Sequence, residues 1–307
     1  MNIGERGVFF FTEGLTATEV VDAAVRLEDL GYGAVWIPEA VGREPFATAA
    51  MILSHTKKLV VATGIVNIYW REPMVCAMGQ QTLTELSDGR FILGLGVSHQ
   101  LLVERTGLTY QKPLGAMRTY IERIRQAHSG VSLRKNLIAE GFDSGRPDAE
   151  TDLSTGPIIV AALGPKMTAL AGEIADGAMP ANTIPKHTEE SRAILGDGPL
   201  LCPMQRVFLS DDEEKSRAAG RALIEFYLAL PNYRSSLLRM GFSEGDLEGG
   251  GSDHLVDSLL AWGSPDHLEQ SIQAHLDAGA NHVCLFPISP HRLSELCWNA
   301  LEAFAPS

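Results

Sequence analysis

Cysteine is scarce in this chain, which contains four among 307 residues. The four are scattered, form no CxxC pair and have no histidine at the spacing of a zinc site; they are Cys76, Cys202, Cys284 and Cys297. A disulfide framework or a structural zinc site needs cysteines at regular or paired spacings. The pattern therefore disfavours both, and it predicts reduced thiols in a cytoplasmic protein.

Long apolar runs are also missing, since no stretch reaches the roughly 18 residues that a membrane-spanning helix requires. The first residues, MNIGERGVFFF, lack the basic start and the cleavage site of a signal peptide. Positive charge is in deficit, because 25 Lys and Arg face 38 Asp and Glu for a formal net charge of −13. Such a chain repels nucleic acids and anionic membranes. With 45% hydrophobic residues, we expect a cytoplasmic enzyme that acts on a small molecule.

A dinucleotide-binding glycine motif is incomplete in the segment GRFILGLGVSHQ, residues 89–100. The Rossmann fingerprint requires a third glycine three residues after the second, where the helix packs against its strand. Here Gly94 and Gly96 are followed at that position by His99, and the next convincing helix begins only after Pro113. The segment is better explained as a buried strand that carries a histidine at its end.

Strand and helix patterns alternate along the chain, as βαβ units require. The expected strands are apolar on both faces, which is typical of parallel strands buried on both sides; they span 6–11, 33–39, 59–68, 90–97, 157–163, 177–182, 199–210 and 281–288. Eight such units predict an α/β fold of the (β/α)₈ TIM-barrel type, in one domain over residues 1–307.

Two segments interrupt the alternation. Residues 140–156 are polar and are expected to form a mobile surface loop. Residues 231–253 form an insertion before the last strand and end in a glycine run that lacks the GK[ST] of a phosphate loop. We interpret those glycines as a hinge or linker.

Function in such a barrel resides where strands end and loops begin. Glu39 and His99 follow the second and fourth expected strands, and Asn182 ends the sixth. A histidine there can transfer protons near neutral pH, and a carboxylate can act as base or hydrogen-bond acceptor. Each could equally be structural, as a core histidine or a loop cap. Tyr69 and Trp70 follow the third strand and could line a slot for a ring or simply pack under the loop.

The segment AALGPKMTALAGEIADG, residues 161–177, has the pattern of an anion site. A strand ends, Gly164 turns the chain, and Pro165 takes the first helical position before Lys166 and Met167. Free N–H groups and the positive helix end attract a phosphate, although an ordinary Gly-Pro helix start looks the same.

Several catalytic patterns are absent. The chain has no HExxH, no GxSxG, no metal-spaced cluster of acidic residues and histidines, and no lysine at the end of an expected strand. A barrel with a phosphate site, aromatic residues and a histidine is what remains. That combination is expected when a cofactor carries the reaction.

The segments ELSDGRFILGLGVSH, ATGIVNI, GYGAVWIPE and AALGPKMTALAGEIADG together resemble the bacterial luciferase-like superfamily. More narrowly, they resemble its actinobacterial oxidoreductases that depend on the deazaflavin coenzyme F420. The similarity runs along the whole chain and includes ALPNYRSSLLRMGF and AGANHVCLF. The resemblance concerns ancestry and does not imply light emission.

The resemblance implies a TIM-type barrel that holds a tricyclic ring at its C-terminal mouth. The cofactor phosphate would lie at the turn formed by Gly164, Pro165, Lys166 and Met167, on its backbone N–H groups, and Asn67 and Asn182 would contribute to the same site. A cis peptide bond at Gly64–Ile65 would support the back of the ring. Glu39 and His99 would be catalytic, and Tyr69 and Trp70 would line the substrate pocket.

The pattern also departs from the sugar-phosphate dehydrogenase branch of the superfamily. That branch has a histidine after the carboxylate of strand two, where this chain has Ala40, and a glutamate in place of His99. We therefore expect an F420-dependent hydride transfer to or from another small organic substrate. An FMN-dependent monooxygenase and a non-catalytic deazaflavin-binding protein are the alternatives. Dimers are common among the relatives, so a homodimer is one expectation, and the sequence leaves the oligomeric state open.

Overall fold

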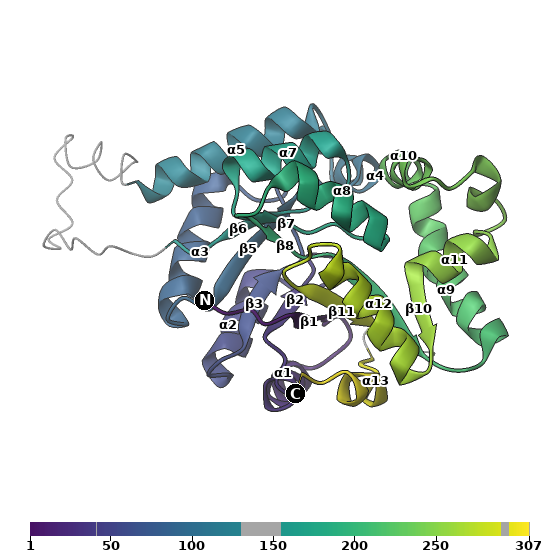
Figure 1. The fold of residues 1–307 in the computed structure, drawn as a ribbon. Helices are drawn as coiled ribbons and strands as arrows, with labels where there is room; N and C mark the ends of the chain where they lie inside the picture. Colours follow the sequence, from purple (N-terminus) through teal and green to yellow (C-terminus); the bar gives the residue numbers. More distant parts are fainter. Residues whose placement is uncertain (41, 130–154, 290–294, 307) are drawn as a thin grey trace, which may run out of the picture.

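The computed structural model describes residues 1–40, 42–129, 155–289 and 295–306. Its strands lie at the centre, and its helices surround them (Figure 1). The strands are β1 (Arg6–Phe9), β2 (Ala34–Ile37), β3 (Val60–Thr63), β4 (Val66–Asn67), β5 (Phe91–Gly96), β6 (Ile158–Val160), β7 (Gly177–Ala178), β8 (Leu200–Leu201), β9 (Met204–Leu209), β10 (Leu260–Gly263) and β11 (Val283–Pro287). Every pairing between these strands is parallel.

The sheet closes into a barrel. Around the ring, β11 pairs with β1, followed in order by β2, β3, β5, β6 and β7. The segment from β8 to β9 completes the ring because it bonds to both neighbours. On one side the Cys202 amide donates to the Ala178 carbonyl (2.9 Å), and on the other the Leu201 carbonyl accepts from the Asn281 amide (2.9 Å). The predicted α/β barrel is thus confirmed.

The helices begin where the sequence gives local start signals. Seven of them start at a proline, whose missing N–H costs nothing in the first helical turn. The helices of the described residues are α1 (Ala17–Asp29), α2 (Pro45–His55), α3 (Pro73–Leu86), α4 (Gln100–Arg105), α5 (Pro113–His128), α7 (Pro165–Ile174), α8 (Pro185–Leu195), α9 (Glu213–Leu228), α10 (Pro231–Met240), the 3₁₀ helix η1 (Glu244–Leu247), α11 (Asp253–Leu259), α12 (Pro265–Asp277) and α13 (Trp298–Ala303). Helix α1 instead begins with a capping box, in which Thr16 and Glu19 bond each other's backbone N–H.

The barrel is a packed core and not a pore. Inward-facing side chains from neighbouring strands fill it, among them Trp36, Ile92, Ile159, Met179 and Phe286. The opposite faces of the strands pack against the apolar faces of the helices. This arrangement places every strand's carboxyl end on one rim, which is called the mouth below.

Two expectations about the elements need correction: the undivided strands and the number of strands. The expected strand at 59–68 is divided into β3 and β4, and that at 199–210 into β8 and β9. Strand β10 was not foreseen; it pairs with β9 alone and lies outside the ring. The insertion at 231–253 is largely helical, and its glycine run, Gly249 to Gly251, connects η1 to α11 with positive φ angles. Most of the expected loop at 140–156 lies outside the described residues.

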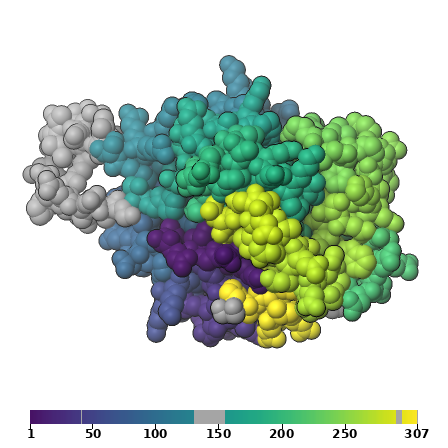
Figure 2. Space-filling view, viewed as in Figure 1, coloured from purple at the N-terminus to yellow at the C-terminus, as the bar shows by residue number. Residues whose placement is uncertain are grey.

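The segment from α9 to α11 forms one flank of the molecule, coloured green in Figure 1. In the space-filling view it is a continuous lobe beside the barrel (Figure 2). Its aromatic residues reach the mouth, since the Tyr233 ring of α10 lies 5.7 Å from the His99 ring beyond β5. The lobe therefore covers part of the rim.

Two buried histidines tie the framework together. His282 is fully buried at the N-terminal end of β11, where Nε2 accepts a hydrogen bond from Trp36 Nε1 (3.0 Å) and Nδ1 donates to the Gly4 carbonyl (2.8 Å). His275 of α12 bonds the Gln205 Oε1 and the Thr188 hydroxyl, both at 2.8 Å. Burial lowers the pKa of each imidazole to about 4. Both rings are therefore neutral in the folded protein at neutral pH.

We expect the protein to lose stability between pH 6.5 and pH 4. In this window the unfolded chain takes up protons on these histidines, whose ordinary pKa is about 6.5, and the folded chain does not. Each histidine then lowers the free energy of unfolding by about 1.4 kcal/mol per pH unit. Urea unfolding from pH 7.5 to 4.5 measures this slope. His275→Gln, which retains hydrogen-bonding capacity, should reduce this slope by about 1.4 kcal/mol per pH unit, the contribution of one proton. An unchanged slope would show that His275 is not a buried neutral histidine with a lowered pKa.

Candidate functional site

The third barrel strand breaks at the mouth. The peptide bond between Gly64 and Ile65 is cis, at the position that the resemblance implied, and it separates β3 from β4. The Gly64 amide donates to the Ile37 carbonyl (2.8 Å), and the Ile65 carbonyl accepts from the Glu39 amide (3.2 Å). Residues 63–67 therefore form a bulge anchored to β2, which is termed the β3–β4 bulge below.

The two glycines of β5 make room for this bulge. A Cβ atom on Gly94 would overlap the Thr63 carbonyl oxygen, and one on Gly96 would lie 2.6 Å from Ile65 Cγ1. The Thr63 hydroxyl also donates to the Gly94 carbonyl and accepts from the Gly94 amide, both at 2.8 Å. The glycine pair of GRFILGLGVSHQ thus allows close approach between strands and forms no nucleotide-binding turn.

Glu39 fixes the far side of the bulge. One carboxylate oxygen accepts from the Asn67 amide (2.7 Å), and the other pairs with Arg71 (2.6 Å). The side chain is 11% exposed. Arg71 also pairs with Glu44 (2.8 Å) and lies 4.5 Å from the centre of the Phe46 ring. Both oxygens of Glu39 are therefore engaged in holding the bulge, so this carboxylate positions its neighbours.

The polar side-chain atoms at the end of the bulge and after it form some of their hydrogen bonds within the protein and leave others unmade. Asn67 is buried, and its Oδ1 accepts from the Tyr69 amide (3.0 Å), but its Nδ2 has no partner in the described chain. The Tyr69 hydroxyl donates to the Gln111 carbonyl (3.1 Å), and its ring packs against Tyr110. The indole Nε1 of Trp70 is buried and has no hydrogen-bond partner among the residues that the structure describes. Asn67 and Trp70 thus retain hydrogen-bond donors for another group.

His99 lies at the mouth directly before α4. Its Nδ1 is buried and has no hydrogen-bond partner among the described residues. Burial lowers the pKa of the imidazole, so the ring is neutral near pH 7. Its neighbours are aromatic, with ring centres of Tyr233 at 5.7 Å and Phe226 at 6.2 Å. The arrangement leaves a neutral imidazole that can accept or donate one proton.

Asn182 follows β7 with a positive φ of 56° and is 3% exposed. In the described part of the chain, neither of its amide atoms has a partner at hydrogen-bond distance. The Asn182 amide faces the Tyr233 hydroxyl; burial raises the pKa of that phenol, and the charge of Arg206 and the nearby Asn182 amide lower it. Tyr233 therefore links Asn182 to His99 across the mouth.

The predicted anion site lies at the start of α7. Gly164 is the N-cap, Pro165 follows it and Lys166 is exposed. The Met167 amide bonds back to the Gly164 carbonyl (3.0 Å), and Pro165 has no N–H, so fewer amides are free here than the sequence suggested. Arg239 of α10 adds a second cation, since its guanidinium lies 3.5 Å from the Leu163 carbonyl oxygen.

Sequence reasoning missed three charged residues at this rim. Arg239 sits in an insertion that carried no motif. Glu13, beyond β1, has a buried carboxylate; burial raises its pKa, while the backbone amides of Glu13 and Thr12 and the charge of Arg43 lower it. Arg206 is 2% exposed on β9. A single charge inside the apolar strand MQRVFL was the available signal for Arg206.

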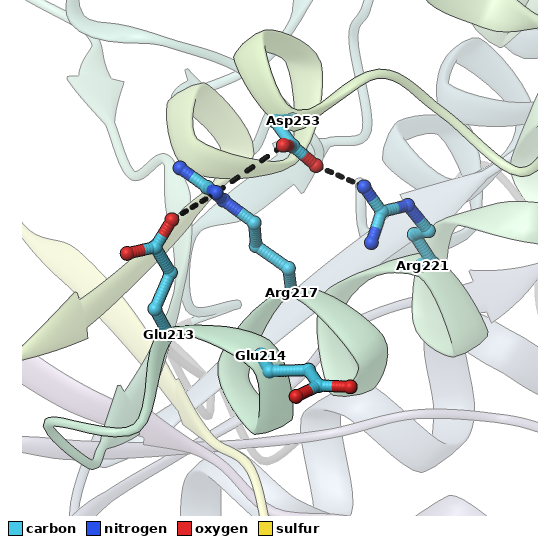
Figure 3. Close-up of a pocket in the computed structure, with 5 residues that line it drawn as sticks. All are labelled: Glu213, Glu214, Arg217, Arg221 and Asp253. Atoms are coloured by element: carbon cyan, nitrogen blue, oxygen red, sulfur yellow. Dashed lines mark hydrogen bonds and ion pairs between the residues drawn. The ribbon is translucent and has the colours of Figure 1, made fainter.

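A surface hollow of about 400 Å³ lies away from these residues (Figure 3). It is lined by Glu213, Glu214, Arg217, Arg221 and Asp253. Arg217 pairs with Glu213 and Asp253, and Arg221 pairs with Asp253. Exposed pairs of this kind neutralise each other and contribute little energy. The hollow is therefore a charged surface network and not the candidate site.

The residues that the structure describes lack two features. No helix in them is long and apolar enough to cross a membrane. No group of three or more histidine, cysteine, aspartate or glutamate side chains in them could hold a metal ion.

Comparison with known proteins agrees with this arrangement. The chain is 27% identical over 297 residues to the 5,10-methylenetetrahydromethanopterin reductase of Archaeoglobus fulgidus, covering 86% of this chain and 88% of the relative. It is 29% identical over 327 residues to a Mycobacterium tuberculosis protein provisionally named a coenzyme F420-dependent oxidoreductase, covering 91% and 92%. The coenzyme F420-dependent tetrahydromethanopterin reductase of Methanopyrus kandleri has the same fold, with a TM-score of 0.77, 21% identity and coverage of 99% and 98%.

The chain also matches the sequence model of a protein family. The model described as "Luciferase-like monooxygenase" matches residues 5–282, which is most of the chain. The barrel, the cis peptide bond and the cationic start of α7 lie within this match. The chain therefore belongs to the luciferase-like monooxygenase family.

Proposed function

We propose that this protein is an oxidoreductase that uses coenzyme F420 and transfers a hydride to or from a small organic substrate. The observation that carries the proposal is a set of buried polar atoms that the described chain leaves without partners. They follow the carboxyl ends of different strands and include Asn67 Nδ2, Trp70 Nε1, His99 Nδ1 and the Asn182 amide. Buried polar groups are normally hydrogen-bonded, so such a set fits a ligand with ring nitrogens and carbonyls.

The remaining features fit the same cofactor. The β3–β4 bulge, with Gly64 and Ile65, would support the flat face of the ring, and Glu39 would keep the bulge in place. The α7 start, with Gly164, Lys166 and Arg239, would hold the phosphate. When bound, the deazaflavin supplies the hydride or accepts it. The name of the Mycobacterium tuberculosis relative, which includes coenzyme F420, supports this choice of cofactor.

The chain's own residues have separate tasks in this proposal. His99, as a neutral imidazole, would accept or donate the proton that accompanies hydride transfer at its Nδ1. Tyr69 and Trp70 would border the substrate. Tyr233 and Phe226 of the helical lobe would exclude water from the mouth, where a low dielectric strengthens the remaining polar contacts.

We expect the purified protein to bind deazaflavin at least about 10-fold more tightly than FMN. Lys166→Ala combined with Arg239→Ala should weaken binding of the phosphorylated deazaflavin by about 10- to 100-fold, because two charge-assisted contacts disappear. Fluorescence titration measures both affinities. The matched control is the ring system without its phosphate, whose affinity should not change in the double variant.

Other outcomes would assign a different function. Tight FMN binding with oxygen consumption in the presence of substrate would replace the proposal with a flavin monooxygenase. Deazaflavin binding without redox turnover across a broad substrate panel would indicate a carrier or binding protein. If neither ring binds, the cofactor site is wrong.

A further inference from the structure

Arg206 is the most unusual charged residue of the molecule. It lies on β9 opposite Phe286 of β11, and its side chain is 2% exposed. Its guanidinium carbon lies 5.2 Å from the centre of the Tyr227 ring and 6.0 Å from that of Phe286. The group is therefore inside the barrel mouth, between an aromatic residue of the lobe and one of the barrel.

No carboxylate of the described residues forms an ion pair with Arg206. Within the same residues, its Nε and Nη1 are buried and have no hydrogen-bond partner. A guanidinium cannot lose its proton in a protein, and an unpaired buried charge is strongly unfavourable. The charge is therefore expected to meet an anion when the protein works.

A comparison with Arg90 shows how a structural arginine looks in this fold. The Arg90 guanidinium donates to the carbonyls of Leu53, Thr56 and Leu59 at 2.8–3.1 Å and so ties a loop to the barrel. Arg206 has no such set of backbone acceptors in the described chain. A purely structural role does not account for its unpartnered donors.

The neighbours of Arg206 belong to the candidate site. Tyr233 lies close enough for the charge of Arg206 to lower the pKa of its phenol, although burial raises that pKa more strongly. Tyr233 also borders Asn182 and His99, whose own polar atoms are unpartnered in the described chain. Arg206 is thus on the same side of the mouth as the groups that face the reaction.

We propose that Arg206 binds an anionic group of the substrate, and that the substrate is an organic molecule with a carboxylate, sulfonate or phosphate. The Asn182 amide donates a second hydrogen bond to this group, and the Tyr227 and Phe286 rings exclude water around the pair. The proposal rests on the proposed function in one respect, which is the presence of a redox cofactor beside the substrate. Binding of the anion by Arg206 does not depend on that function.

Binding of small anions and their neutral counterparts tests the proposal. The probes are acetate, benzoate and benzenesulfonate, with acetamide, benzamide and benzenesulfonamide as controls. Calorimetric titration is done with the protein alone and with saturating deazaflavin. We expect at least one anion to bind about 10-fold more tightly than its neutral counterpart, and Arg206→Met to abolish this preference. Arg206→Lys should keep part of it.

Two further measurements separate a binding role from a structural one. Without ligand, Arg206→Met should leave the thermal unfolding midpoint equal or higher, since it removes an unpaired buried charge. Arg217→Met, which removes a surface arginine of the hollow in Figure 3, is the matched control and should leave anion binding unchanged. A large drop in the Arg206→Met midpoint would instead show a structural pair and overturn the proposal.

The outcomes distinguish this inference from the proposed function. If no anion is preferred over its neutral counterpart, or if Arg206→Met keeps the preference, the inference is wrong even when deazaflavin binds. If Arg206→Met weakens deazaflavin itself by about 10-fold or more and leaves the probes unaffected, Arg206 belongs to the cofactor site and the inference is overturned. If anions bind through Arg206 and deazaflavin does not bind, the inference holds and the proposed cofactor is wrong.

Discussion

Replacing Gly94 with alanine is expected to prevent stable folding. The added Cβ would overlap the Thr63 carbonyl oxygen, which is backbone and cannot rotate away. Strands β3 and β5 would have to separate, which would also break the two hydrogen bonds between the Thr63 hydroxyl and Gly94. We expect a loss of about 4 kcal/mol or more, a large share of the roughly 5–15 kcal/mol that stabilises a typical domain. Chemical unfolding followed by circular dichroism measures this loss.

Gly115→Ala is the matched control for this substitution. Gly115 lies in α5, and nothing stands within 4 Å of the position that its Cβ would take. Alanine favours a helix over glycine by about 0.5–1 kcal/mol, so this variant should be as stable as the parent or slightly more stable. If Gly94→Ala unfolds at the same denaturant concentration as Gly115→Ala, the close approach of the two strands is not required.

Replacing Glu39 with glutamine is expected to loosen the β3–β4 bulge and weaken cofactor binding. The charge pair with Arg71 is lost, while the side chain keeps its size and one acceptor for the Asn67 amide. The pKa of Arg71 is raised because its bonds to Glu39 and Glu44 outweigh burial, which lowers it. Removing one partner of a partly buried pair should cost about 2 kcal/mol. We also expect deazaflavin binding to weaken about 10-fold, because the surface that supports the ring is less ordered.

Glu44→Gln provides the control, since Glu44 pairs with the same arginine. The Glu44 side chain is 48% exposed, against 11% for Glu39. Exposed ion pairs contribute about 0–1 kcal/mol, so this change should have a small effect on stability and on binding. Equal effects of the two substitutions would show that charge alone, and not the position of Glu39 under the bulge, determines the result.

For the expected residues at the mouth, local sequence could predict the position along the chain but not the interaction partners. Their positions after strands were predictable, because parallel strands end on one rim and the strand pattern was clear for Glu39 and His99. Their partners were not predictable. Glu39 bonds residues 28 and 32 positions away, and such contacts depend on how β2 and the bulge pack together. The cytoplasmic location and the homodimer stay predictions.

Arg206 and Arg239 show the opposite case, in which no local pattern was sufficient. Arg239 reaches the start of α7 from a helix 76 residues further along the chain than Leu163. Arg206 follows Gln205 in the otherwise apolar strand β9, and only the closed barrel shows that it is buried at the mouth, where no carboxylate of the described residues pairs with it. Long-range packing decides which charges are paired, so an unpaired one cannot be recognised before the fold is known.

The amino-acid sequence by itself determined the repeated βα units, the helix starts at prolines and the glycines of β5, because hydrophobic periodicity and backbone chemistry are local properties. The resemblance to a known family, and not local pattern, placed a cis peptide bond at Gly64–Ile65 within the expected third strand. The tertiary structure alone decided that β3 and β8–β9 break, that β10 lies outside the ring, and that the helical lobe brings Tyr233 against His99. These features arise from contacts between residues far apart in the chain. The free energy of those contacts exceeds the local preference of each segment for helix or strand only when the barrel closes.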